Sequence, residues 1–132
     1  MTVGALRIGQ VGLGNWGRNL ARVFDDVAAV TWLCDASEAR REEFAERYPE
    51  ARVTGDFDEL LAADDVDAVV IATPVPTHFP LARTALEAGK HVFVEKPPAM
   101  RVAEMEELIG LADSRGLVLM PGHLLLYHPA VQ

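Results

Sequence analysis

Two hydrophobic patterns alternate along the chain. Short runs of β-branched and other apolar residues predict strands, and longer segments between them have apolar residues three or four positions apart, as on one face of a helix. The runs predict strands at 6–11, 28–34, 52–54, 68–72, 91–95 and 117–120. The fourth and fifth runs are apolar at nearly every position, which is typical of parallel strands covered on both faces. The alternation therefore predicts an α/β fold, a doubly wound parallel sheet of about six strands with helices on both faces.

Several segments of helical period carry signals of where a helix begins or ends. The apolar stripes that we expect to face the sheet are Trp16, Leu20, Val23 and Phe24, then Phe44, Ala45 and Tyr48, and later Val102, Met105, Leu108, Ile109 and Ala112. Ser37 and Asp56 are predicted to cap helices at their N-termini. Gly89 and Gly116 are predicted to end helices.

The composition fits one globular domain and disfavours some partners. The 132 residues are 50% hydrophobic and 24% charged, which is sufficient to fill one core. The formal net charge of -8 repels polyanions, so we expect no binding to nucleic acid or to an anionic membrane. Cys34 has no second cysteine to pair with, and no segment approaches the roughly 20 apolar residues of a membrane helix. A cytoplasmic location is therefore expected.

A glycine motif follows the first predicted strand and opens the first predicted helix. In this GxGxxG pattern the first glycine permits a tight turn, the second lets the backbone approach a pyrophosphate, and the third lets helix and strand pack closely. Free N–H groups and the positive dipole end of the helix would then attract phosphates. We expect a dinucleotide to bind here, at Gly12, Gly14, Asn15, Trp16 and Gly17.

An acidic residue at the end of the second predicted strand indicates which dinucleotide binds. Asp35 stands 18 residues after Gly17, where a carboxylate can accept hydrogen bonds from both hydroxyls of an adenine ribose. It would repel the 2′-phosphate of NADP, so NAD is the expected cofactor, although Arg40 and Arg41 could soften this preference. The alternative is that Asp35 caps the following helix and that both arginines lie on a solvated surface.

The second half of the chain contains several further motifs. From residue 72 it reads ATPVPTHFPLARTALEAGKHVFVEKP. With the glycine motif and Asp35, the segments Ala72-Thr73-Pro74 with His78, Gly89-Lys90-His91-Val92 and Glu95-Lys96-Pro97 follow the order and approximate spacing of the Gfo/Idh/MocA oxidoreductases. The chain resembles the N-terminal cofactor domain of such enzymes over nearly its whole length. The resemblance implies a Rossmann domain, an NAD-dependent dehydrogenase, and a sugar, cyclitol or nucleotide-sugar substrate.

The resemblance also implies roles for individual residues. Thr73 and Pro74 would line the nicotinamide ribose, with His78 and Glu95 close to the cofactor. Lys96 resembles the family lysine that contacts nicotinamide and substrate, where it would exchange the hydroxyl proton as hydride leaves carbon. Other roles remain open: the prolines could only shape a loop, His78 could be a packing residue, and Glu95 with Lys96 could form a surface ion pair.

The C-terminal tail resembles the segment that leads from the cofactor domain into a substrate domain. We expect residues 1–121 to form the dinucleotide-binding domain and 122–132 to begin the connection to a substrate domain absent from this chain. His123 and Tyr127 would contact the substrate, or would belong to a hydrophobic crossing. The apolar surface left in the isolated chain favours a homo-oligomer or docking of the missing domain.

Three functions therefore compete. The first is an oxidoreductase that transfers a hydride between NAD and a hydroxyl or ketone of a sugar-like substrate, with the activity of this chain alone left open. The second is a non-catalytic module that binds NAD or senses a ligand; the short chain favours it and the intact motif at residues 95–97 counts against it. The third is another Rossmann-type protein, such as a semialdehyde dehydrogenase domain, which the lack of a cysteine nucleophile in the second half disfavours.

Overall fold

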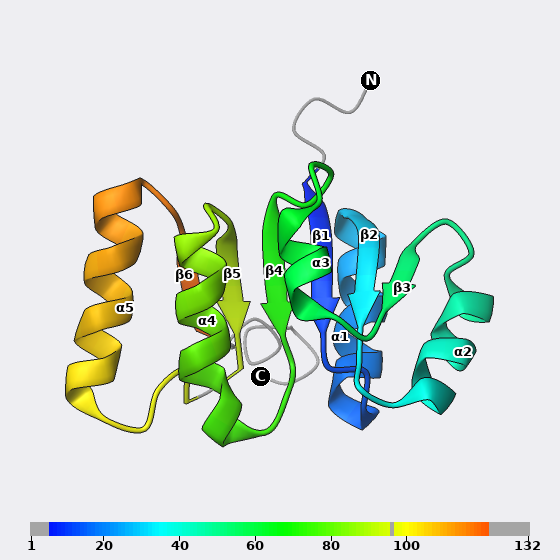
Figure 1. Cartoon of the computed structure of the whole chain (residues 1–132), viewed down its shortest axis with the longest axis horizontal. Coiled ribbons are helices and arrows are strands. Elements are labelled where there is room, and N and C mark those ends of the chain that lie inside the picture. The colour runs from blue at the N-terminus through cyan, green and yellow to red at the C-terminus, as the bar shows by residue number, and fades with distance from the viewer. Residues whose placement is uncertain (1–5, 96, 122–132) are drawn as a thin grey trace, which may run out of the picture.

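Residues 6–95 and 97–121 are described by a computed structural model of the chain, and they form one sheet flanked by helices (Figure 1). The strands are β1 (Arg7–Val11), β2 (Ala29–Cys34), β3 (Arg52–Thr54), β4 (Ala68–Ile71), β5 (His91–Val94) and β6 (Leu119–Pro121). The helices are α1 (Asn15–Val27), α2 (Glu38–Arg47), α3 (Phe57–Ala62), α4 (His78–Glu87) and α5 (Val102–Arg115), with a 3-10 turn, η1 (Val75–Thr77), before α4. No helix of these residues is long and apolar enough to cross a membrane.

The sheet has the order β3-β2-β1-β4-β5-β6, and every neighbouring pair of strands is parallel. This is the strand order of the doubly wound Rossmann sheet, so the predicted fold class is confirmed. The observed strand ends lie within two residues of the predicted ones.

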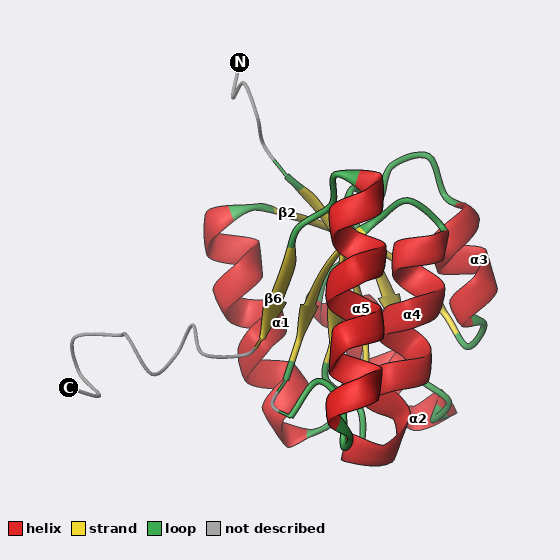
Figure 2. Ribbon diagram, turned by 90° about the vertical axis from the view of Figure 1, so that its left-hand side faces the viewer, coloured by secondary structure: helices red, strands yellow, loops and turns green. Residues whose placement is uncertain are grey.

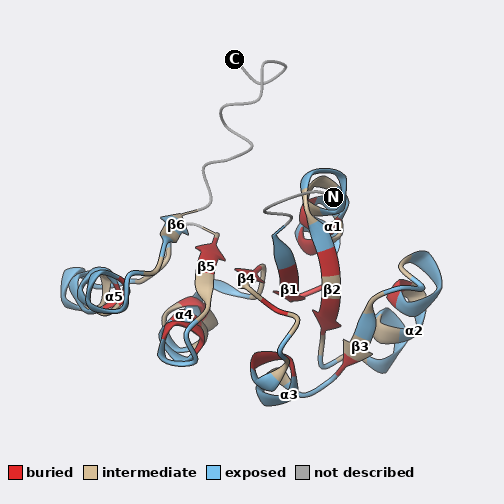
Figure 3. Cartoon of the chain, turned by 90° about the horizontal axis from the view of Figure 1, so that it is seen from above, coloured by how far each residue is buried: buried red, intermediate tan, exposed pale blue. Residues whose placement is uncertain are grey.

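Helices cover both faces of the sheet, and each face has its own apolar core (Figure 3). Leu20 of α1 and Phe44 of α2 belong to one core. The other core includes residues of α3, α4 and α5, such as Leu86, and Figure 2 shows these three helices across the strands from α1. In β4, Val70 belongs to the first core and Val69 to the second. A strand buried on both faces explains the continuous apolar run in the sequence.

Most helix ends follow the predicted signals. The hydroxyl of Ser37 accepts a hydrogen bond from the Arg40 backbone N–H at 3.3 Å, which caps α2. The carboxylate of Asp56 caps α3 in the same way by accepting from the backbone N–H of Asp58 at 3.0 Å. Gly116 ends α5 with a left-handed φ of 66°. The N-cap of α1, by contrast, makes no side-chain hydrogen bond to the helix.

The predicted stripes are wrong at some positions. Four residues expected to face the sheet are exposed. The exposed fractions are 41% for Trp16, 77% for Val102 and 45% for Ile109, and Ala45 is also exposed. In α5 the buried residues are Leu108 and Ala112, and each residue turns a helix by about 100°, so Ile109 points away from the sheet. Trp16 lies in the first turn of α1, where it lines a cleft.

Candidate functional site

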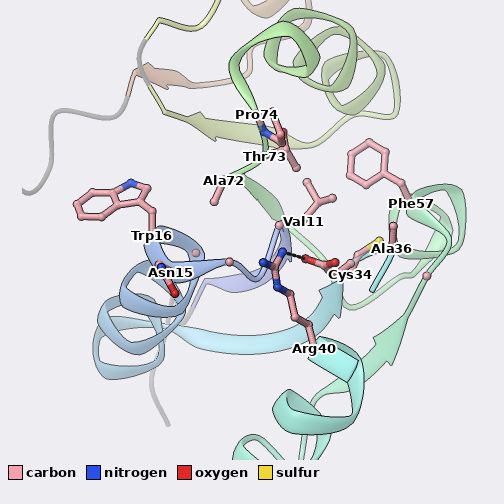
Figure 4. Close-up of a pocket in the computed structure, with 15 residues that line it drawn as sticks. Val11, Asn15, Trp16, Cys34, Ala36, Arg40, Phe57, Ala72, Thr73 and Pro74 are labelled. Carbon is pink, nitrogen blue, oxygen red and sulfur yellow. Dashed lines mark ion pairs between the residues drawn. The ribbon is translucent and has the colours of Figure 1, made fainter. Parts of the chain in front are cut away.

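The cleft opens at the carboxyl ends of β1, β2 and β4 and encloses about 560 Å³ (Figure 4). Its walls are the glycine turn and first turn of α1, the residues that end β2, and the loop after β4. The strand order reverses between β1 and β4, and ligands of doubly wound sheets bind at such a switch point. Of the predicted site residues, eight line this cleft: Gly12, Gly14, Asn15, Trp16, Gly17, Asp35, Thr73 and Pro74.

Two of the three glycines of the motif are required by close contacts within the protein. Gly12 has a φ of +99°, and an added Cβ would lie 2.4 Å from the carbonyl oxygen of Ala72. A Cβ on Gly17 would lie 2.2 Å from the carbonyl oxygen of Gly12. Gly14 differs, because the nearest atom to an added Cβ would be Nη1 of Arg40 at 3.6 Å. A side chain at Gly14 would therefore meet only the flexible end of Arg40, so the protein itself does not require this glycine, whereas the close approach of a ligand to the backbone does.

The start of α1 is suited to an anion. Gly14 is its N-cap and has no side chain that could bond the first N–H groups. The first turn contains no acidic residue. The partial positive charge of the helix N-terminus is therefore not offset locally, which favours a phosphate there.

Asp35 is held by the backbone on both carboxylate oxygens. Oδ2 accepts a hydrogen bond from the backbone N–H of Leu13 at 2.8 Å, and Oδ1 accepts from that of Ser37 at 2.8 Å. The side chain is only 10% exposed. The N-cap of α2 is Ser37, so the alternative that Asp35 caps this helix is wrong. Each carboxylate oxygen keeps a second lone pair, with which it can accept from a hydroxyl of a ligand.

The two arginines that follow Asp35 have different surroundings. Arg40 lines the cleft and lies 3.8 Å from Oδ2 of Asp35, the ion pair dashed in Figure 4, with its side chain half exposed. Arg41 instead donates to the backbone carbonyl oxygens of Asp35 at 2.8 Å and Ala36 at 3.1 Å. Arg41 thus stabilises the loop after β2, while Arg40 remains available to a bound anion.

His78 is buried below the loops and is not among the residues that line the cleft. It is 1% exposed, and its ring nitrogens lie 2.7 Å from the carbonyl oxygen of Thr73 and 2.9 Å from that of Pro97. A neutral imidazole has one N–H and donates to one of these carbonyls, whereas the protonated ring donates to both. His78 therefore connects the loop after β4 with the loop after β5.

The remaining predicted site residues either are not among those that line the cleft or lie outside the described residues. Glu95 is half-buried, and its backbone N–H donates to the carbonyl oxygen of Ile71 at 3.3 Å. Lys96, His123 and Tyr127 lie outside the described residues.

Sequence reasoning missed the residues that line the cleft from β3. Gly55 follows β3, and Phe57 begins α3. The signal that could have found them is the strand order, because β3 lies next to β2 and its carboxyl end meets the same edge of the sheet. Cys34 also lines the cleft, and burial, together with the nearby charge of Asp35, raises the pKa of its thiol to about 11. A thiol with a raised pKa forms little thiolate near neutral pH, so Cys34 is not a reactive group.

A comparison with models of protein families shows to which family the chain belongs. The model of an oxidoreductase family with an NAD-binding Rossmann fold, Gfo/Idh/MocA, matches residues 6–123. The chain belongs to this family. The resemblance seen in the sequence is confirmed, and so is the expected use of an NAD-type cofactor.

Known members of the Gfo/Idh/MocA family are similar to this chain. A UDP-N-acetylglucosamine 3-dehydrogenase of Acidithiobacillus ferrooxidans is 39% identical over 127 residues, which are 96% of this chain and 40% of the relative. The crystal structure of GenD2 from gentamicin A biosynthesis, in complex with NAD, has a TM-score of 0.90 and 37% identity over 98% of this chain and 37% of that one. A variant of a 3-ketoreductase from Actinomadura kijaniata, in complex with TDP-benzene and NADP, has a TM-score of 0.86 and 32% identity over 96% of this chain and 39% of that one. The chain spans about two fifths of the length of these proteins.

Proposed function

We propose that this chain is the cofactor domain of an oxidoreductase that moves a hydride between NAD and a hydroxyl or ketone carbon of a sugar, cyclitol or nucleotide sugar. The observation that carries the proposal is that one cleft combines an uncapped helix N-terminus with the carboxylate of Asp35. The substrate class is supported by relatives named for UDP-N-acetylglucosamine and for 3-ketoreduction.

The residues of the cleft fit the parts of a dinucleotide in order. The pyrophosphate would lie against the backbone of Gly14 and the first N–H groups of α1, where a Cβ would otherwise occupy the space. Asp35 would accept from the adenine ribose. Thr73 and Pro74, at the other wall of the cleft, would contact the nicotinamide ribose.

The chemistry is assigned to Lys96. Bound NAD supplies the nicotinamide carbon that accepts or returns a hydride. Lys96 would hold the substrate oxygen and take its proton during oxidation, then return that proton during reduction. Glu95 precedes it in the sequence, and His78 secures the carbonyl of Pro97 on its other side. His123 and Tyr127 are assigned to the substrate as part of the same proposal.

Further parts of the assembly follow from the length of the relatives. We assign residues 1–121 to the cofactor domain and 122–132 to the start of a connection to a substrate domain. The chain covers only about two fifths of the similar proteins, which supports this division. We expect a cytoplasmic protein in which this domain forms a homo-oligomer or docks against the missing substrate domain, and the single cysteine of this chain fits a reducing compartment.

Cofactor binding is tested by calorimetric titration of the chain with NAD and with NADP. The expected result is saturable binding of NAD that is tighter than binding of NADP. A chain that is folded by circular dichroism and binds neither dinucleotide would refute the proposal.

Catalysis is tested on the protein in which this chain is followed by a substrate domain. Reduced nicotinamide is followed by absorbance with a panel of sugars, cyclitols and nucleotide sugars, for the wild type and for Lys96→Ala. The substitution should abolish turnover while NAD still binds. If the wild type binds NAD but oxidises no member of the panel, a non-catalytic NAD-binding module becomes the better description.

A further inference from the structure

Gln10 is a fully buried polar residue inside β1, directly below the glycine turn. Ile8, two residues earlier and on the same face of the strand, belongs to the apolar core under α1. A buried amide is unfavourable unless it forms hydrogen bonds, so an apolar residue would be expected at this position of a strand. The presence of glutamine therefore calls for a specific set of partners.

The partners of Gln10 are two carbonyl groups of the turn. Its Nε2 donates to the carbonyl oxygen of Gly12 at 2.9 Å and to that of Gly17 at 2.7 Å. One amide group thus connects the start of the turn with the first turn of α1. Among the described residues, Oε1 of Gln10 has no hydrogen-bond partner, so the side chain acts through its donors.

These contacts fix the orientation of the peptide between Gly12 and Leu13. Gln10 binds the carbonyl oxygen of this peptide, and Asp35 accepts from its N–H at 2.8 Å. The N–H of Gly12 itself donates to the carbonyl oxygen of Cys34 at 2.9 Å. Glycine adopts many backbone conformations, so without a fixed partner the peptide could rotate and turn its carbonyl oxygen toward the cleft. A carbonyl oxygen there would repel a phosphate.

We propose that Gln10 is a positioning residue for dinucleotide binding. It holds the carbonyl groups of Gly12 and Gly17 on the strand side of the turn, so that backbone N–H groups face the pyrophosphate. The same contact keeps the Leu13 N–H on the carboxylate of Asp35. The inference rests on the proposed function, because it assumes a pyrophosphate in the cleft.

The test is Gln10→Met, which keeps the length of the side chain and removes both donors. Loss of one or two hydrogen bonds lowers the population of the binding-competent turn, so NAD should bind about tenfold more weakly. Adenosine, which has the ribose but no phosphate, should lose at most about twofold.

A local effect is separated from general destabilisation by amide hydrogen exchange measured by NMR. In Gln10→Met the Leu13 amide should exchange faster while amides in β4 and β5 stay protected. Leu108→Ala, in the core under α5, is the control: it should lower stability and leave NAD affinity unchanged.

Each outcome has a defined meaning. The inference is wrong if the wild type binds NAD and Gln10→Met binds it equally well. It is also wrong if NAD and adenosine weaken equally while exchange rises throughout the core. Failure of the wild type itself to bind NAD would instead refute the proposed function.

Discussion

Replacement of Asp35 by alanine tests the preference for NAD. Each hydrogen bond between a ribose hydroxyl and this carboxylate contributes about 1.5–3 kcal/mol, because the acceptor is charged. The side chain is only 10% exposed and its geometry is fixed by two backbone N–H groups, so solvent does little to weaken such contacts. Taking the lower value for two hydroxyls gives about 3 kcal/mol, which weakens NAD binding about 100-fold.

NADP should respond to the same substitution differently from NAD. The 2′-phosphate is repelled by the carboxylate of Asp35, and Arg40 lies 3.8 Å from the same carboxylate. In Asp35→Ala the repulsion disappears and the guanidinium of Arg40 is left without this partner, so NADP should bind at least as tightly as NAD. The double variant Asp35→Ala with Arg40→Ala should lose this gain.

Calorimetric titration with both dinucleotides measures these effects. Asp67→Ala is the matched control, because Asp67 is also a hydrogen-bonded aspartate but lies outside the cleft, where it binds Arg7. The reasoning is refuted if Asp35→Ala keeps its NAD affinity within about threefold of the wild type, a difference below one hydrogen bond. It is equally refuted if NAD and NADP weaken in parallel.

Three further predictions concern stability and reactivity. Gly17→Ala places a Cβ 2.2 Å from a backbone oxygen and should lower the free energy of unfolding in urea by about 3 kcal/mol. Gly110 has open space around it, so the control Gly110→Ala should stabilise α5 by about 0.5–1 kcal/mol. The thiol of Cys34, whose pKa is raised to about 11 by burial, should react with Ellman's reagent at pH 8 only as fast as the chain unfolds; rapid reaction of the folded chain would contradict its burial. The hydrogen bond from Arg7 holds the pKa of Asp67 below its ordinary value, so this pair stabilises the fold above the unfolded pKa of about 3.9, and its contribution is lost as the pH falls through the lower, folded pKa. Asp67→Asn should therefore flatten the acid limb of the stability profile, and an unchanged limb would exclude the pair as a contributor.

The sequence was sufficient to predict the sheet and the place of the cleft. The apolar run of β4 is continuous because both faces of the strand are buried, and that reason is independent of any partner. Gly17 is likewise dictated by a backbone contact within one short turn, because an added Cβ would meet the carbonyl oxygen of Gly12, whereas the contact of Gly12 with Ala72 joins segments that are distant in the sequence. Signals of this kind depend on neighbours in the sequence or on the period of an element, so they can be read without the fold.

Contacts between distant segments were not accessible in this way. The sequence left open whether His78 lies near the cofactor or is a packing residue, and it did not indicate that the ring joins carbonyl groups of two loops, one of them 19 residues away. Trp16 fits the helical stripe of α1 yet lies on a wall of the cleft, because the first turn of the helix extends past the ends of the strands. A hydrophobic period records the side of the helix on which a residue lies, and it does not record where the sheet ends.

The carboxylate of Asp35 and the glycine turn depend on each other. Asp35 binds the Leu13 N–H and thereby holds one end of the peptide whose other end is held by Gln10. Loss of the carboxylate therefore removes a ribose acceptor and also loosens the turn that would receive the pyrophosphate.

For this reason the NADP affinity of Asp35→Ala reports two opposing effects: relief of repulsion at the ribose and a less ordered turn. Adding Gln10→Met to Asp35→Ala separates them, because the peptide is already free at one end and the second substitution should cost less than it does in the wild type. Full additivity of the two losses would show that the peptide between Gly12 and Leu13 does not couple the two residues.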